Sequence, residues 1–387
     1  MAMVRMSLIL LIVSIALTGC GKPAPEESTR FSYTGEQDVV SLGVARSKDY
    51  LHVVWVEAHD PPQAFHSRSR DGRTWSDPVA IDTEQAPPDR SSRSNDIRIA
   101  AHDESLVVVW QTQGEGFRGS GPMVLARSSD GGQTWHAAEP PATTSAAPSH
   151  GFFALSATSG GEFHLAWLDN RHGQQGLHHA HSKDGLDWSA VTTIESITCQ
   201  CCWNTLAHGE RHHYVLYRGI APRDMHLAVQ PHDGNWRTTA AVGAFGWDIN
   251  GCPHVGGGLV ASDDALHALV WTGSEAYQGV HYTRGKPDGT GWQEQARVAA
   301  KEAGNPDLSL RGGGGLTAVW DQNGAAAGIY VAWIENDRFS RALRLSDRPQ
   351  ARLPLALPVD TGAAVFWTER GSNGRLGWVV SVVEGSK

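Results

Sequence analysis

A short motif that ends in tryptophan recurs along this sequence and restricts the folds that the chain can adopt. Its three clearest copies occupy residues 69–75, 128–135 and 182–188, and two shorter copies end at Trp236 and Trp292. Each copy contains Asp-Gly: the Asp side chain can accept hydrogen bonds from the N–H groups of a turn, and the Gly can adopt φ > 0. The Trp can then pack back over a β-hairpin. Five copies at intervals of about 50 to 60 residues therefore predict a repeated antiparallel unit.

A second repeated element alternates with these turns. It is a strand-like run that ends in an aromatic residue, and its copies occupy 51–55, 106–110, 163–167, 213–217, 266–271, 316–320 and 363–367. Short strands at this spacing predict an all-β fold, a β-propeller of four-stranded antiparallel blades. Seven runs favour seven blades over six, although 329–333 can be read as a third strand or as another second strand. The last blade has about three strands of its own, so Phe31–Tyr33 is expected to supply its fourth.

The turns resemble the Asp-box, or BNR, repeats of the sialidase superfamily. The resemblance covers nearly all of residues 31–387, which are expected to form a single sialidase-like propeller domain. It implies a fold more than an activity, because the box lies on the outer, lower side of a blade and many proteins that carry it hydrolyse nothing.

The N-terminus has the features of an export signal. Residues 1–19 contain a basic start, an apolar run too short to span a bilayer permanently, and a cleavage site. Residues 17–20 (Leu-Thr-Gly-Cys) resemble the lipobox of bacterial lipoproteins, which implies lipid attachment at Cys20; an ordinary cleaved signal peptide is the alternative. Residues 20–30 are expected to form a flexible tether. Because Gly21 follows the cysteine, the resemblance implies a lipid-anchored protein of the cell envelope, at the periplasmic face of the outer membrane.

Charge limits the class of partner. The formal net charge is -9, and Lys and Arg are scattered singly rather than gathered in a basic stripe. Nucleic acid is therefore excluded as an expected partner, and a small molecule, a glycan or a protein remains.

The binding site of a propeller is expected where the loops that enter the first strands, and those that join second to third strands, open around the axis. Those loops carry polar residues that include His150, Asn204, Asn305 and Asp307. Asn250 is a further candidate for ligand binding.

The resemblance to sialidases implies a particular set of residues on that face. Three arginines would hold a carboxylate, because the guanidinium offers a planar bidentate fork. A Tyr nucleophile with a Glu partner and an Asp acid/base would perform the hydrolysis. The arginine candidates are Arg171, Arg218, Arg223 and Arg370, and the catalytic candidates are Asp96, Asp169, Glu275 and Tyr277. The Phe-Arg-Ile-Pro or Tyr-Arg-Ile-Pro motif of sialidases is absent, and its nearest counterpart is Ile97–Ala100.

The cysteines form the sharpest local pattern. Cys199, Cys201 and Cys202 enter one expected blade, and Cys252 with His254 enters the next. These segments, together with Arg218 and Arg223, resemble a subgroup of secreted sialidase-like propellers. Four cysteines in an oxidising compartment favour disulfides, with Cys252 paired to Cys201 or Cys202. The alternative is a site for Cu(I) or Zn that uses the four thiols and His254.

Histidine is abundant, at 19 residues, and is concentrated in 178–181 and 212–213. Strand alternation places His179 and His181 on one face and His178 on the other, so these residues do not form a chelating trio, and they are interpreted as surface or hydrogen-bonded strand histidines.

Three functions therefore remain open. The first is binding of an anionic or glycan-derived ligand on the cysteine- and arginine-bearing face. The second is an exo-acting glycoside hydrolase of sialidase type, and the third is periplasmic binding of copper or zinc. The sequence requires no cofactor.

Overall fold

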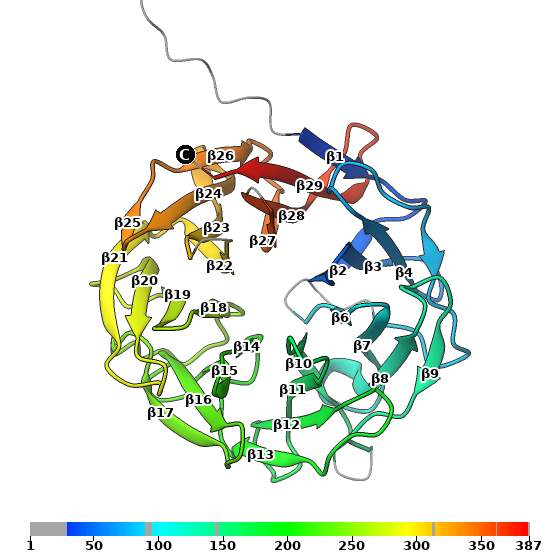
Figure 1. The fold of residues 1–387 in the computed structure, drawn as a ribbon, viewed down its shortest axis with the longest axis horizontal. Coiled ribbons are helices and arrows are strands. Elements are labelled where there is room, and N and C mark those ends of the chain that lie inside the picture. Colours follow the sequence, from blue (N-terminus) through cyan, green and yellow to red (C-terminus); the bar gives the residue numbers. More distant parts are fainter. Residues whose placement is uncertain (1–28, 90–94, 144–146, 312–313, 361, 386–387) are drawn as a thin grey trace, which may run out of the picture.

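The computed structural model describes residues 29–89, 95–143, 147–311, 314–360 and 362–385. Seven antiparallel sheets surround a central axis like the blades of a propeller (Figure 1). The prediction of a seven-bladed all-β propeller is thus confirmed. Cys20 lies outside the described residues, so lipid attachment there stays a prediction.

The first four blades follow one another along the chain. Blade 1 contains β2 (Val39–Arg46), β3 (Leu51–Glu57), β4 (Gln63–Ser69) and β5 (Val79–Ala80). Blade 2 contains β6 (Arg98–His102), β7 (Ser105–Gln113), β8 (Ser120–Ser128) and β9 (His136–Ala138). Blade 3 contains β10 (Gly151–Ala157), β11 (Phe163–Asp169), β12 (Gly176–Ser182) and β13 (Thr192–Glu195). Blade 4 contains β14 (Thr205–His208), β15 (His212–Arg218), β16 (Met225–Pro231) and β17 (Arg237–Ala241).

The last three blades complete the ring. Blade 5 contains β18 (Gly257–Ala261), β19 (Leu266–Thr272), β20 (Gly279–Gly285) and β21 (Gln293–Ala299). Blade 6 contains β22 (Ala303–Leu310), β23 (Leu316–Gln322), β24 (Gly328–Glu335), β25 (Arg338–Phe339) and β26 (Leu343–Ser346). Blade 7 contains β27 (Arg352–Val359), β28 (Gly362–Arg370), β29 (Leu376–Glu384) and β1 (Thr29–Tyr33). The described helical segments are two 3-10 turns, η1 (Phe117–Gly119) and η2 (Gly324–Ala326).

The ring closes as the sequence predicted. β1 pairs antiparallel with β29, with Phe31 opposite Val380 and Tyr33 opposite Trp378. The six-bladed alternative is wrong, because β24 pairs with β23 on one side and with β25 and β26 on the other, as the third strand of a blade.

The core lies between neighbouring blades. The second strands of blades 1 and 3, β3 and β11, are buried at every position. Strands covered on both faces carry continuous apolar runs instead of alternating ones, which explains the strand-like repeats in the sequence. Between blades 7 and 1, for example, Trp55 packs with Phe366 and Trp378.

The Asp-Gly turns join third to fourth strands and have the predicted chemistry. Asp71 accepts hydrogen bonds from the backbone N–H groups of Arg73 (2.8 Å) and Thr74 (2.9 Å). Gly72 has φ 71°, and Asp130 and Asp184 make equivalent bonds in blades 2 and 3.

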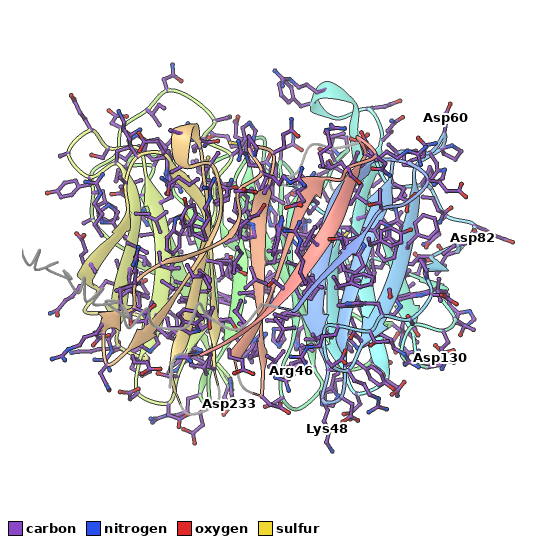
Figure 2. All side chains as sticks on the ribbon, turned by 90° about the horizontal axis from the view of Figure 1, so that it is seen from above. Arg46, Lys48, Asp60, Asp82, Asp130 and Asp233 are labelled. Atoms are coloured by element: carbon purple, nitrogen blue, oxygen red, sulfur yellow. The ribbon has the colours of Figure 1, made fainter. Side chains whose placement is uncertain are left out.

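The molecule has two distinct faces, seen edge-on in Figure 2. The upper face carries the loops between second and third strands, such as the loop with Asp60. The lower face carries the turns between first and second strands and between third and fourth strands, where Lys48, Asp130 and Asp233 lie. Among the described residues, no helix is long and apolar enough to cross a membrane.

Candidate functional site

Three cysteines form a buried cluster on the upper face, in the loop that connects β13 of blade 3 to β14 of blade 4. Cys199, Cys201 and Cys202 are only 1%, 4% and 1% exposed. The Sγ atom of Cys199 lies 3.8 Å from that of Cys201 and 3.6 Å from that of Cys202. All three sulfurs lie within 4.8 Å of one another. We call these residues the cysteine cluster.

Hydrogen bonds give the three thiols different acidities. The sulfurs of Cys201 and Cys202 lie within hydrogen-bond distance of Cys199 Sγ, and Arg223 donates to Cys199 Sγ from Nη1 at 3.1 Å. These contacts, the one with Cys201 foremost, hold the pKa of Cys199 well below its usual range. Burial raises the pKa of Cys202 to about 11. Within the cluster, these surroundings favour the thiolate form at Cys199 over Cys201 and Cys202.

The predicted disulfide is not formed in the structure, where the four described cysteines are all free. Cys252 is exposed, in the loop before β18, whereas its proposed partners Cys201 and Cys202 are buried in the cluster. His254 is exposed in the same loop, with φ 52°. Three of the five predicted metal ligands are thus brought together by one loop, and the other two lie on a separate, exposed loop.

Arg218 fixes the loops around the cluster. It is 1% exposed, and its guanidinium donates four hydrogen bonds to backbone carbonyls. The acceptors are Val255 (3.1 and 3.0 Å), Arg223 (2.6 Å) and Trp271 (3.1 Å). Because Cys199 N–H in turn donates to the Arg218 carbonyl (3.0 Å), this arginine connects the cysteine loop to blade 5. Its buried guanidinium is positioned to support the loops instead of a ligand carboxylate.

The other predicted ligand-binding residues are distributed around the face. Arg171 forms an ion pair with Asp169 (2.6 Å). Arg223 spans from the carbonyl of Ile249 (2.9 Å) to the cysteine cluster. Arg370 donates to the carbonyl of Gly374, in blade 7, and Asn250 is exposed beside Ile249.

The predicted catalytic residues occupy contrasting environments. Asp96 is buried and accepts bonds from Ser41 Oγ and Leu42 N–H (both 3.1 Å), which links blades 1 and 2. The Asp169 carboxylate accepts from Trp167 Nε1 (2.7 Å) and pairs with Arg171 and His178. Despite burial, these partners, His178 foremost, hold the pKa of Asp169 well below its usual range.

Glu275 and Tyr277, the predicted partner and nucleophile, are both exposed on the loop between β19 and β20, and Tyr277 is 46% exposed. Neither lines a described cavity. Asp96 is the one predicted catalytic residue that lines the pocket on the propeller axis.

That pocket opens at the upper end of the axis and has a volume of about 150 Å³. Its polar lining consists of Asp96, Arg98, Trp203, Asn204, Thr205, Asn305 and Asp307. Burial raises the pKa of Asp307 to about 6, against hydrogen bonds from backbone N–H groups, including that of Ala356 (2.9 Å). The sequence analysis grouped Asp307 with the other polar loop residues. Nothing in the neighbouring sequence marks it as special, because its carboxyl is enclosed by the pairing of strands and not by residues near it in the chain.

Comparisons with known proteins place the chain by fold alone. No family model matches the sequence. No curated protein matches it either.

Solved structures of similar fold are numerous and distant in sequence. A polysaccharide lyase of family PL25, an ulvan lyase, has a TM-score of 0.58 at 10% identity, covering 90% of this chain and 95% of its own. A protein of unknown function from Dyadobacter fermentans has a TM-score of 0.55 at 11% identity, covering 92% and 98%. The α-L-arabinofuranosidase Arb93A from Fusarium graminearum has a TM-score of 0.51 at 13% identity, covering 92% and 97%.

Proposed function

We propose that this protein binds a thiophilic metal ion, Cu(I) or Zn²⁺, through Cys199, Cys201 and Cys202 on the upper face of the propeller. The spacing of the sulfurs carries the proposal: Cys199 Sγ lies 3.8 Å from Cys201 Sγ and 3.6 Å from Cys202 Sγ. A tetrahedral ion with bonds of about 2.3 Å to sulfur holds its thiolates about 3.8 Å apart. The ion would therefore enter with little rearrangement of the loop.

The surroundings also suit a soft ion. Cys199 already has the character of a thiolate, and metal binding would displace the protons that Cys201 and Cys202 keep. Arg223 beside Cys199 offsets part of the negative charge of three thiolates. Burial excludes water and keeps competing oxygen ligands away, which favours thiolate coordination of Cu(I) and Zn²⁺.

Metal titration tests this proposal directly. The reduced protein, without chelator, is titrated with Zn²⁺ in competition with a chromophoric chelator, while alkylation of the thiols is followed by mass spectrometry. We expect one equivalent of Zn²⁺ to protect Cys199, Cys201 and Cys202 from alkylation. Cys202→Ser should weaken binding by at least about 100-fold, since a thiolate ligand is lost from a buried site.

Cys252→Ser is the matched control, because Cys252 is exposed and lies outside the cluster. It should bind Zn²⁺ as the wild type does. The proposal fails if zinc leaves the three clustered thiols unprotected, or if Cys252→Ser and Cys202→Ser lose the same affinity.

Export and anchoring through Cys20 belong to the same proposal. The support is the signal-like sequence 1–20 alone. Intact mass of the membrane-extracted protein tests it: a chain that begins at an unmodified residue would contradict lipidation.

The axial pocket supports a second candidate function, the binding or cleavage of a glycan. Asp307, with a pKa raised to about 6, is suited to hold or release a proton near neutral pH, and Asp96 and Arg98 line the same pocket. Trp203 also lines this pocket and is an aromatic residue of the kind that packs against sugar rings. Distant proteins of this fold include a PL25 ulvan lyase and an α-L-arabinofuranosidase.

Paired variants distinguish this candidate from the sialidase hypothesis. The purified protein is assayed on sialosides, α-L-arabinofuranosides and ulvan. If the axial pocket is catalytic, Asp307→Asn should lower kcat by at least about 100-fold, as expected for loss of a general acid or base, whereas Glu275→Gln should leave it unchanged. The reverse pattern would favour a sialidase-type site, and no turnover or binding of any of these glycans would remove the candidate.

A further inference from the structure

A cluster of histidines lies at the lower end of the axis, opposite to the cysteine cluster. Blade 3 contributes residues of β11 and β12, and blade 4 contributes residues of β14, β15 and the segment after β16. The members are His164, His179, His181, His208, His213 and His232. The His164 ring lies 4.3 Å from that of His213 and 4.7 Å from that of His208, centroid to centroid. Ligand nitrogens of His164, His208 and His213 all lie within 4.8 Å of one another.

Part of this cluster repeats elsewhere in the fold, so the repeat provides an internal comparison. In blade 1, His52 Nδ1 contacts His66 Nε2 at 3.1 Å, as His164 Nδ1 contacts His179 Nε2 at 3.0 Å in blade 3. In blade 1 the other nitrogen of the second-strand histidine, His52 Nε2, contacts the hydroxyl of Ser47 at 3.0 Å. In blade 3 the corresponding nitrogen, His164 Nε2, meets a carboxylate oxygen of Glu162 at 3.2 Å. Only the blade 3 pair also faces two further histidines, His208 and His213, from the next blade.

Hydrogen bonds to residues around the cluster orient the histidine rings, as hydrogen bonds do in metal sites. Metal-binding histidines commonly use one ring nitrogen for the ion and the other for a hydrogen bond. His164 uses Nδ1 for His179, and His208 uses Nε2 for Ser156 Oγ (2.8 Å). The other two nitrogens are His164 Nε2, which contacts the Glu162 carboxylate at 3.2 Å, and His208 Nδ1. His208 Nδ1 in turn lies 2.9 Å from His213 Nδ1.

The Nδ1 atoms of His208 and His213 make a hydrogen bond of 2.9 Å, a separation that two ligands of one metal ion would also have. Two nitrogens bound at about 2.0 to 2.1 Å lie about 2.9 Å apart when they are cis ligands at 90°, and about 3.4 Å apart in a tetrahedron. Cis ligands at 90° are typical of the tetragonal sites of Ni²⁺ and Cu²⁺.

The surroundings of the cluster fit a cation. The cluster borders a cavity of about 1180 Å³ at the lower end of the axis. Its charged lining is Glu162, Lys183, Glu210 and Asp263, three acids and one base. An ion held at its wall would keep coordination positions open toward the cavity.

We propose that His164, His208 and His213, with Glu162 beside them, bind a divalent transition-metal ion of the Ni²⁺ or Cu²⁺ type at the lower end of the propeller axis. This site differs from the cysteine cluster in position, in ligand chemistry and in the ion that it prefers. It does not depend on the proposed function of the upper face.

Calorimetric titration with Ni²⁺ at pH 7.5 tests the proposal in a Cys199→Ser, Cys201→Ser, Cys202→Ser background, which removes the upper cluster. We expect one Ni²⁺ per chain. His208→Ala with His213→Ala should weaken binding at least about 100-fold, because two of three imidazole ligands are lost. Glu162→Gln should weaken it by about 10-fold while leaving every buried imidazole in place.

His212→Ala is the matched control, since His212 neighbours His213 in sequence but lies on the opposite face of β15. It should bind Ni²⁺ unchanged. Circular dichroism and thermal unfolding establish that each variant is folded, and Glu162→Gln serves as the test if the double histidine variant is not. Absence of Ni²⁺ uptake in the triple-serine protein, or equal affinity in Glu162→Gln and His212→Ala, would overturn the proposal and leave the histidines as polar packing.

Discussion

At the scale of single residues, the guanidinium of Arg218 holds together the loops that surround the cysteine cluster. We expect Arg218→Lys to lower the free energy of unfolding by about 3 kcal/mol, because a lysine ammonium cannot reach all of the buried carbonyls that the planar guanidinium satisfies. Urea denaturation measures the change. Arg370→Lys is the matched control: Arg370 is exposed and donates to the Gly374 carbonyl, so its replacement should change stability by less than about 0.5 kcal/mol. Equal losses in the two variants would contradict this role of Arg218.

The candidate site could be predicted only in part from residue identity. Cys199, Cys201 and Cys202 were recognisable because residues so close in sequence on one loop stay close in space. Arg218 was predicted to bind a ligand, but its hydrogen bonds run to carbonyls 37 and 53 residues away, which no local pattern reveals. Asp307 was not distinguished for the same reason, because its raised pKa arises from enclosure by segments distant in sequence.

At the scale of strands and turns, the repeats made the blades predictable. The Asp-Gly turns, and the second strands that are buried on both faces, each produce a pattern in consecutive residues. Strand order and the seven blades could therefore be predicted from the sequence. The histidine cluster left no such signal. Alternation along β12 correctly separates His178 from His179, but His208 and His213, which face His164, come from β14 and β15 of the next blade. A pattern within one strand cannot report a contact between two blades.

The packing of turns against strands also explains why histidine recurs on the second and third strands. The Trp of one Asp-Gly turn packs against a third-strand histidine of the preceding blade: Trp135 against His66 (5.4 Å between ring centroids) and Trp236 against His179 (5.0 Å). In both blades that histidine contacts a second-strand histidine. The interpretation of the histidines in 178–181 and 212–213 as hydrogen-bonded strand residues fits His179, but it did not include the contacts of His164 with His208 and His213.

At the scale of the whole molecule, these buried histidines should make the propeller sensitive to acid. Burial lowers the pKa of His52 to about 3 and that of His66 to about 4, below the ordinary histidine pKa of 6.5. A group whose pKa is lower when folded binds its proton more readily in the unfolded chain, so its stabilisation is complete above pH 6.5 and declines as the pH falls toward the folded pKa. His66 alone should lower the free energy of unfolding by about 2 kcal/mol between pH 7.5 and pH 5.

The acid sensitivity that the histidines cause can be measured separately from that of the aspartates in the Asp-Gly turns, because the two groups titrate in different pH ranges. Hydrogen bonds from turn N–H groups lower the pKa of Asp71, with the bond from Thr74 foremost, so its contribution is lost only below about pH 4. Urea unfolding at pH 7.5, 6 and 5 therefore isolates the histidines. His66→Gln should reduce the loss of stability between pH 7.5 and 5, whereas the exposed His136→Gln should leave it unchanged. If the two variants keep the same pH dependence as the wild type, the buried pair of blade 1 does not titrate in this range, and the acid sensitivity originates in other groups, such as His150 or His267, whose pKa values burial also lowers.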